Sequence, residues 1–206
     1  DVHLSVEGLK RITEPVDILD RDAFEKELNE LGSLRAKADA IRTRLAKSIN
    51  TKYQENPAYY ENFSKRIKEA LELYKARTIT EVEYLAKMRD ILEDYRTGKS
   101  AIAYPDRIRA NVHAQAFYGV LTAIFSNEKL SVEPDFAAEM ALDITTIIEK
   151  HSQVDWTHNL TIHDRISQDI DDLFYRYQKE MGLVLSFDVI DMIIENVKTV
   201  ALRRFA

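Results

Sequence analysis

The segment NPAYYENFSKRIKEALELYKARTITEVEYLAKMRDILEDY, residues 56–95, decides the fold class. Asn56 can cap a first helix, and Pro57 suits its first turn, where no backbone N–H is needed. Thr80 and Glu83 have the spacing of a capping box at the start of a second helix. Apolar residues recur at steps of three or four, and the expected buried stripes are Tyr60, Phe63, Ile67, Leu71 and Tyr74, then Val82, Leu85, Met88, Leu92 and Tyr95. Two such amphipathic helices in succession predict a helical hairpin.

The remainder of the chain has the same helical pattern. Six further helices are expected over residues 22–31, 34–49, 111–125, 136–148, 162–181 and 187–200. The apolar stripe of the helix over residues 162–181 ends at Met181. Gly98 and Gly182 suit helix ends, whereas Thr161 and Ser186 suit helix starts. The run Leu183-Val184-Leu185 is too short to found a sheet. The sequence therefore predicts an all-α fold, an irregular helical bundle of about eight helices with no significant sheet.

The composition fits a packed helical domain. The chain has 206 residues, 45% of them hydrophobic and 31% charged, with only 5 glycines and 4 prolines, so a sizeable core is expected. There is no cysteine, which excludes disulfides and thiolate sites. No apolar run reaches about 18 residues and no signal peptide is visible, so we expect no membrane partner. The first residue is Asp1 rather than Met, which we interpret as the mark of an excised fragment.

Charge is unevenly distributed along the chain. The net charge of −6 argues against a uniformly basic nucleic-acid binder. Between residues 33 and 52, six basic residues face Asp39 alone, a net charge of about +5. Between residues 133 and 172, ten acids face only Lys150 and Arg165, a net charge of about −8. The first segment suits contact with phosphate and the second repels it; the alternative is that both are solvated helix faces.

Two motifs with a likeness to catalytic sites are better explained as helix boundaries. Gly98-Lys99-Ser100 resembles the end of a phosphate-binding loop, but the residue five positions before Gly98 is Glu93 instead of glycine, and no strand precedes the motif. Pro105-Asp106 and Pro134-Asp135 suggest a metal-dependent nuclease, which also needs an acid-x-Lys element, and no lysine in the chain follows an acid by two positions. We therefore expect no catalytic residue, and the Pro-Asp pairs predict helix starts.

The spacing of histidines and acids does not predict a metal site. His158 and His163 are five residues apart, which places them on different helix faces, unlike an i, i+4 pair of zinc ligands. Asp169, Asp171 and Asp172 form an acidic cluster, for which a solvated helix face is favoured over a metal or docking site. We therefore assign none of these residues as a metal ligand.

Trp156 is the single tryptophan and lies in a connection between two expected helices. A half-buried tryptophan can anchor an interface with a partner. The commoner role of such a residue is to fill the core between helices. Both roles stay open at the level of the sequence, with the core role favoured.

Six motifs occur in the order that they have in a known family. Besides the helical hairpin, they are Leu9-Lys10-Arg11-Ile12-Thr13, Ala116-Phe117-Tyr118-Gly119, Val154-Asp155-Trp156-Thr157-His158-Asn159, Ile170-Asp171-Asp172, and the run from Leu185-Ser186-Phe187 to Arg203-Arg204. Together they resemble the C-terminal region of the R subunit of type I restriction enzymes. The resemblance covers nearly the whole chain, most specifically residues 56–204.

The resemblance implies that the chain is part of a longer subunit, an ATP-dependent DNA translocase and endonuclease, whose regions have different functions. In that family the nuclease and the two ATPase motor lobes lie N-terminal to this region, so ATP and Mg²⁺ belong to the parent subunit and no cofactor is expected here. Residues 1–52 look like the end of a helical spacer domain, and residues 53–206 look like a C-terminal helical assembly domain. The implied function is non-catalytic: docking the motor subunit onto the methyltransferase and specificity subunits, and helping to hold double-stranded DNA, in the bacterial cytoplasm.

Three sets of residues are candidates for intermolecular contacts. The partner-docking candidates are Asp155, Trp156, His158, Asp171 and Asp172. The DNA-binding candidates are Arg35, Arg42, Arg44, Lys47 and Lys52. A cluster of cations after a loop, Lys99, Arg107 and Arg109, would suit a small nucleotide. Two alternatives to docking therefore stay open: a sequence-independent DNA-binding helical module, and a helical domain with a small nucleotide-binding pocket.

Overall fold

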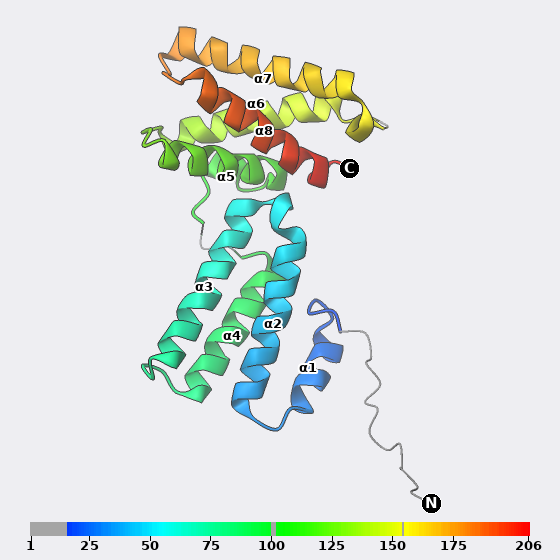
Figure 1. Ribbon diagram of the computed structural model, residues 1–206, viewed down its shortest axis with the longest axis vertical. Coiled ribbons are helices and arrows are strands. Elements are labelled where there is room, and N and C mark those ends of the chain that lie inside the picture. The colour runs from blue at the N-terminus through cyan, green and yellow to red at the C-terminus, as the bar shows by residue number, and fades with distance from the viewer. Residues whose placement is uncertain (1–15, 100–101, 154) are drawn as a thin grey trace, which may run out of the picture.

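The computed structural model describes residues 16–99, 102–153 and 155–206, and within these ranges it contains eight α-helices and no strand (Figure 1). The predicted all-α fold is therefore confirmed. The α-helices are α1 (Arg21–Asn29), α2 (Leu34–Lys52), α3 (Pro57–Lys75), α4 (Glu81–Thr97), α5 (Val112–Asn127), α6 (Pro134–His151), α7 (Leu160–Met181) and α8 (Phe187–Arg204). Three short 3-10 helices connect them: η1 (Tyr53–Glu55), η2 (Asp106–Ile108) and η3 (Trp156–His158).

Several helices start and end at the residues that the sequence predicts. The Oγ of Ser33 accepts a hydrogen bond from a backbone N–H of α2, and Oδ1 of Asn56 accepts one from a backbone N–H of α3. Both bonds of the capping box between Thr80 and Glu83 are present at the start of α4. Gly98 ends α4 in the left-handed conformation, with φ of 70°. Caps of this kind satisfy the backbone groups that a helix end leaves unpaired.

The start of α7 differs from the prediction. Asn159, not Thr161, is the N-cap, and its Oδ1 accepts hydrogen bonds from the backbone N–H groups of Thr161 and Ile162. Thr161 is therefore already inside the helix. The prediction was wrong because both residue types are good caps, and asparagine is at least as strong as threonine at this position.

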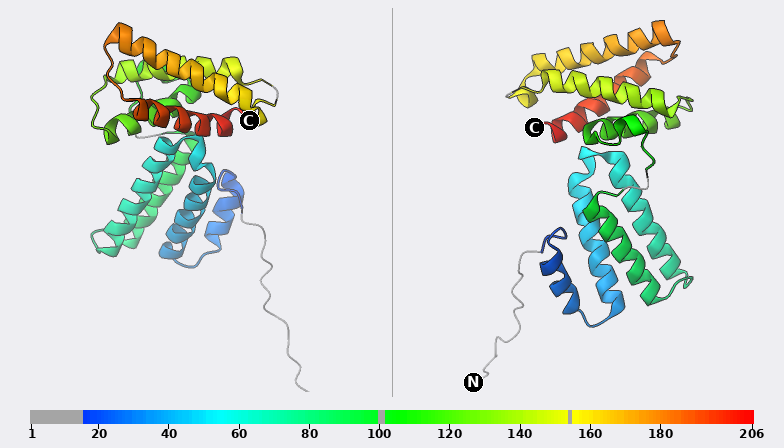
Figure 2. Two further views of the ribbon diagram at one scale, coloured as in Figure 1. Left: turned by 45° about the horizontal axis from the view of Figure 1, so that its top comes forward. Right: turned by 180° about the vertical axis from the view of Figure 1, so that it is seen from behind.

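Helices α1–α4 form the N-terminal unit, residues 16–99. Helix α4 packs against α2 and α3, and α1 lies beside α2 (Figures 1 and 2). The buried core of the N-terminal unit includes Phe24, Ile41, Leu45, Phe63, Tyr84, Met88 and Leu92. Each such side chain stabilises the fold by about 1.5–3 kcal/mol when it is removed from water. The helical hairpin α3–α4 predicted from residues 56–95 thus shares this core with α2 and α1.

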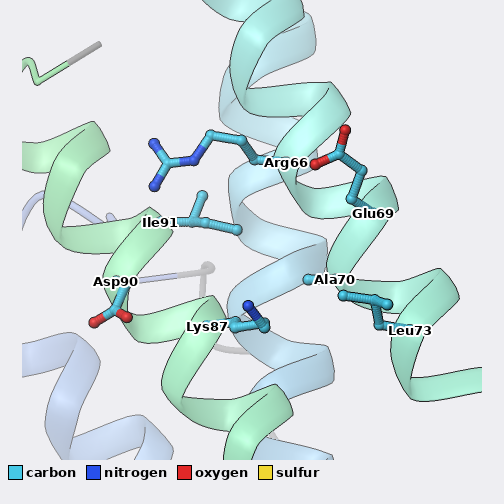
Figure 3. Close-up of a pocket in the computed structure, with 7 residues that line it drawn as sticks. All are labelled: Arg66, Glu69, Ala70, Leu73, Lys87, Asp90 and Ile91. Carbon is cyan, nitrogen blue, oxygen red and sulfur yellow. The ribbon is translucent and has the colours of Figure 1, made fainter. Parts of the chain in front are cut away.

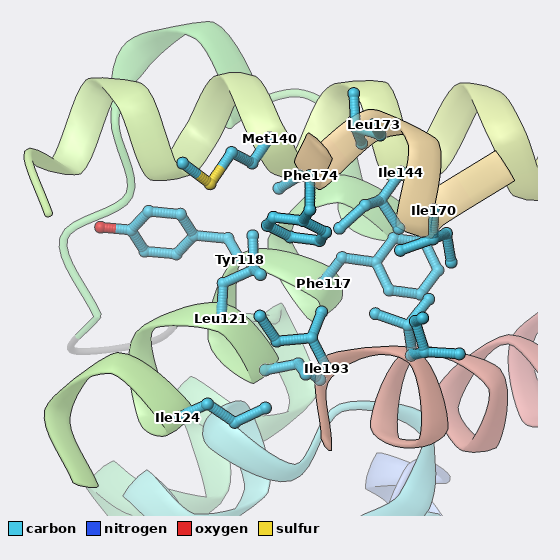
Figure 4. Close-up of a cluster of buried hydrophobic side chains, with 14 of the residues drawn as sticks. Phe117, Tyr118, Leu121, Ile124, Met140, Ile144, Ile170, Leu173, Phe174 and Ile193 are labelled. Carbon is cyan, nitrogen blue, oxygen red and sulfur yellow. The ribbon is translucent and has the colours of Figure 1, made fainter. Parts of the chain in front are cut away.

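Helices α5–α8 form the C-terminal unit, residues 102–206, which has a hydrophobic core of its own. Helix α5 is its centre, because α6 and α8 both pack on it and it carries no charged residue. Phe117 and Leu121 of α5 meet Ile144 of α6, Phe174 of α7 and Ile193 of α8 in this core (Figure 4). The outer surfaces of α6 and α7 are left to meet solvent or a partner.

Four residues expected on apolar helix faces are exposed: Leu34 and Val112, which are the first residues of α2 and α5, and Val82 and Met181. Val82 has 63% of its surface exposed, and the buried positions of α4 include Tyr84 and Ile91 instead. The predicted stripe of α4 begins with two successive steps of three residues. Because three residues are less than a full helical turn, Val82 at its start points away from the core. Met181 is 60% exposed because it is the last residue of α7, where the core below the helix ends.

The two units meet in a close junction. Glycine is required at position 119 of α5, because a Cβ there would lie 2.6 Å from the Cβ of Ala58 in α3. Arg204 at the end of α8 donates hydrogen bonds to the backbone oxygens of Glu55 and Val112, at 3.1 and 3.0 Å. The α8 end therefore holds η1 of the N-terminal unit and the start of α5 together.

The buried apolar residues thus fall into two clusters, which lie within residues 18–95 and residues 108–201. The expected domain boundary between residues 52 and 53 falls where α2 passes into η1, inside the range of the first cluster. The assignment of residues 1–52 to a spacer and residues 53–206 to an assembly domain stays a prediction.

Candidate partner-docking and DNA-contact surfaces

The net negative charge of the described residues lies on the C-terminal unit. The N-terminal unit has 17 basic and 16 acidic residues, a net charge of about +1. The C-terminal unit has 10 basic and 16 acidic residues, a net charge of about −6. A surface of this sign repels phosphate and attracts basic protein surfaces.

The outward face of α7 carries part of this charge without internal partners. Asp164, Asp171, Asp172 and Tyr175 are exposed. Among the described residues, no ion pair or hydrogen bond engages the carboxylate of Asp171 or of Asp172. Two of the five docking candidates are therefore available to a partner.

Other acids of the same region are used inside the unit. The carboxylate of Asp169 lies 2.9 Å from Nζ of Lys150 and 2.8 Å from Nε2 of His151, both at the end of α6. Hydrogen bonds from Lys150 and then His151 hold the pKa of the Asp169 carboxyl below its ordinary value of 3.8. Similarly, Tyr177 of α7 donates a hydrogen bond to Asp143 of α6 at 2.8 Å. These pairs join α6 to α7, so the acidic cluster of residues 169–172 divides into a structural member and two free ones.

The docking candidates near Trp156 have mixed positions. Trp156 is only 3% exposed, and its Nε1 donates a hydrogen bond to the backbone oxygen of Phe205 at 2.9 Å. The core role favoured by the sequence is therefore confirmed, and this side chain does not reach a partner surface. Asp155 and His158 are exposed beside it. They precede α7, and Asp171 lies about 17 Å along the axis from the start of that helix, near its middle.

The DNA-binding candidates of α2 divide between two faces. Arg35 and Arg42 both pair with Asp39. The other three line one shallow groove with residues 16–19, and they are Arg44, Lys47 and Lys52. Arg44 also pairs with Glu27 of α1 at 2.8 Å. The structure therefore brings three of the five cations together, one of them partly neutralised.

Two of the three nucleotide-pocket candidates form ion pairs, and each has a different partner. Arg107 pairs with Glu139 of α6 at 3.2 Å, and Arg109 pairs with Asp106 of its own 3-10 helix. Lys99 follows the Gly98 cap at the end of α4 and is exposed. None of the three cations lines the groove beside α2 that holds Arg44, Lys47 and Lys52.

A concavity that the sequence did not indicate lies between α3 and α4 (Figure 3). Its lining consists of Arg66, Glu69, Ala70, Leu73, Lys87, Asp90 and Ile91. Arg66 is already paired with Asp94 at 2.6 Å. Two cations and two acids line the concavity, and this balance of charge favours neither an anion nor a cation as ligand.

The described residues were compared with the requirements of a metal site and of a membrane span. Within them, no three His, Asp or Glu side chains gather closely enough to hold a metal ion. None of the helices described is long and apolar enough to cross a bilayer.

An apolar surface that was not predicted from the sequence lies at the turn between α7 and α8. Met181, Val184 and Phe187 are all exposed there. The available signal was the position of Phe187, which comes two residues before the buried stripe of α8 begins at Val189 and therefore lies off that stripe.

Comparisons with known proteins show the family of the chain. A family model described as "Type I restriction enzyme HindI endonuclease subunit-like, C-terminal" matches residues 6–201. The type I restriction enzyme HindI endonuclease subunit of Haemophilus influenzae is 26% identical over 127 residues, which are 62% of this chain and 12% of that protein. The chain therefore spans a small part of the length of that relative. No solved structure matches the chain.

The family match covers nearly the whole chain and agrees with the resemblance carried by the hairpin and the C-terminal motifs. The chain belongs to the family of C-terminal regions of HindI-like type I restriction endonuclease subunits.

Proposed function

We propose that this chain docks the motor subunit of a type I restriction enzyme onto its methyltransferase–specificity core, and that the C-terminal unit makes the contact. The observation that carries the proposal is the free acidic face of α7, with Asp171 and Asp172 unpaired among the described residues, on a unit with a net charge of about −6. Such a face attracts a basic protein surface and speeds its approach.

The rigid junction supports a positioning role. The close approach of Gly119 to Ala58, and the hydrogen bonds of Arg204 to η1 and α5, hold the two units in a fixed relation. A partner bound to the C-terminal unit is then held at a set angle to whatever precedes the N-terminal unit. In the parent enzyme this would fix the path of DNA from the recognition site into the motor.

Under this proposal the chain contributes binding and orientation only. ATP-dependent translocation and DNA cleavage, with their ATP and Mg²⁺, would belong to other parts of the parent subunit. Docking needs complementary surfaces and no reactive group.

Gel filtration tests the proposal. The purified chain is mixed with the methyltransferase–specificity core at two salt concentrations, with and without duplex DNA. Co-elution without DNA, weaker at the higher salt concentration, is expected. Absence of co-elution at both salt concentrations would contradict the docking function.

A second candidate function is sequence-independent DNA contact by the N-terminal unit. The groove that brings Arg44, Lys47 and Lys52 together favours it. Contacts to phosphates weaken steeply with salt because they release counterions. Fluorescence anisotropy with a labelled duplex should therefore show an affinity that falls between low and physiological salt, and Lys47→Glu should reduce it further. An affinity independent of salt would contradict DNA contact.

A further inference from the structure

The turn between α7 and α8 exposes an apolar surface, which we call the α7–α8 tip and define as Met181, Val184 and Phe187. Val184 and Phe187 are each 84% exposed, and Met181 is 60% exposed. These three residues lie within seven positions of one another in the sequence. Contiguous exposed apolar side chains commonly mark sites of interaction with a partner.

The backbone beneath the tip is firmly held. Gly182 ends α7 in the left-handed conformation, with φ of 70°. The side-chain amide of Gln178 donates a hydrogen bond to the backbone oxygen of Leu185 at 3.2 Å, and Leu185 is buried in the core. Ser186 then caps α8, so that Phe187 occupies its first position. A surface held in this way loses little conformational freedom when it binds.

The tip lies far from the junction between the units. Helix α8 runs from the tip to Arg204, and its 18 residues span about 27 Å (Figure 1). The N-terminal unit contacts the opposite end of α8, through η1. A large partner can therefore reach the tip without meeting the N-terminal unit.

The charges around the tip restrict its occupant. Along the chain from residue 179 to residue 191, three exposed acids, Glu180, Asp188 and Asp191, face one exposed cation, Lys179. The whole C-terminal unit carries a net charge of about −6. DNA and anionic lipid are therefore repelled, and a second copy of this unit is repelled as well. The complementary occupant is a protein surface with an apolar pocket and a rim of lysine or arginine.

We infer that the α7–α8 tip is the anchor of the docking surface, and that it inserts Phe187 into a basic-rimmed apolar pocket of the methyltransferase–specificity core. This inference rests on the proposed docking function. Phe187 supplies the buried apolar centre of the contact, and the acids of α7 and α8 supply its polar rim.

A pair of matched variants tests the inference. Phe187→Ser removes the exposed ring from the first position of α8. Leu160→Ser makes the corresponding change at the first position of α7, at the opposite end of the unit, where Leu160 is 75% exposed. Circular dichroism and thermal melting of both variants check that the fold is kept. Affinity for the methyltransferase–specificity core is then measured by surface plasmon resonance.

The outcomes separate the inference from the proposed function. Phe187→Ser is expected to bind about tenfold or more weakly than the unsubstituted chain, mainly through faster dissociation, while Leu160→Ser binds normally. If the unsubstituted chain binds and Phe187→Ser binds equally well, the tip is not the anchor, although docking stands. If the unsubstituted chain does not bind the core, the proposed function fails, and the inference fails with it.

Discussion

Nε of Arg204 in the last turn of α8 donates a hydrogen bond to Nδ1 of His113 at the start of α5, over 3.3 Å. The same guanidinium donates to the backbone oxygens of Glu55 and Val112. Because Nδ1 of His113 is the acceptor, the neutral form of the ring fits this junction and the imidazolium does not. Arg204 thus bonds to both units, and His113 makes the position of its guanidinium sensitive to protonation.

Replacing Arg204 should loosen the junction. Arg204→Met keeps much of the apolar length of the side chain but leaves two backbone oxygens and a ring nitrogen without their donor. We expect a loss of about 2–3 kcal/mol in the free energy of unfolding, measured by urea denaturation. Arg203→Met removes only an exposed contact to Gln54 and serves as the control. Equal losses in the two variants would show that Arg204 has no special role.

The junction should weaken in mild acid. Burial, followed by the nearby charge of Arg204, lowers the pKa of His113 from its ordinary value of 6.5, although Glu149 opposes this in part. The unfolded chain therefore binds a proton more readily than the folded chain does. The stabilisation is full above about pH 6.5 and is lost as the pH falls below it.

Thermal melting between pH 7.5 and pH 5 checks this prediction, and His113→Asn is the comparison. Asparagine keeps an acceptor for Arg204 and does not titrate. The melting temperature of the variant should fall less over this range than that of the unsubstituted chain. Identical pH profiles would show that His113 does not contribute to the dependence.

Gly119→Ala should destabilise the chain through a clash across the junction. The added Cβ would lie 2.6 Å from Cβ of Ala58, and both belong to packed helices, so the units must separate slightly. We expect a loss of about 1–3 kcal/mol by urea denaturation. Gly32→Ala meets no atom within 4 Å and is the control. The double variant Gly119→Ala with Ala58→Gly should recover part of the loss, and absence of recovery would contradict the proposed contact.

Charge reversal on α7 should slow assembly without unfolding the chain. Asp171→Lys with Asp172→Lys changes the sign of two exposed side chains, so we expect an association rate with the core about tenfold or more slower at low salt. Glu69→Lys with Asp90→Lys makes the same change of charge on exposed residues of the N-terminal unit. Stopped-flow kinetics compares the pairs. If both pairs slow association equally, the net charge of the chain matters and this face does not.

The sequence predicted the helices well because their signals are local. The capping box of Thr80 and Glu83, the Asn56 cap and the Gly98 end each depend on residues within one turn, and the structure confirms them. The N-cap of α7 was predicted wrongly, as Thr161 instead of Asn159, because asparagine and threonine are both favourable N-cap residues.

The surfaces were harder to predict because they depend on contacts between distant residues. Asp169 resembles Asp171 and Asp172 in sequence, yet only its position opposite Lys150 and His151 of α6 engages it internally. Similarly, nothing near Gly119 in the sequence indicates that Ala58 will pack against it. For the α7–α8 tip, the sequence signal was limited to the position of Phe187 before the buried stripe of α8.

Hydroxyl-radical footprinting of the chain, alone and mixed with the methyltransferase–specificity core, tests the docking account most directly. Tyr175, Met181 and Phe187 are exposed side chains of reactive types on the proposed surface, and Tyr53 of η1 is an exposed aromatic residue outside it. The account predicts that the core reduces the labelling of the first three and leaves Tyr53 unchanged. Loss of labelling at Tyr53 alone, or no loss at any of the four residues, would contradict it.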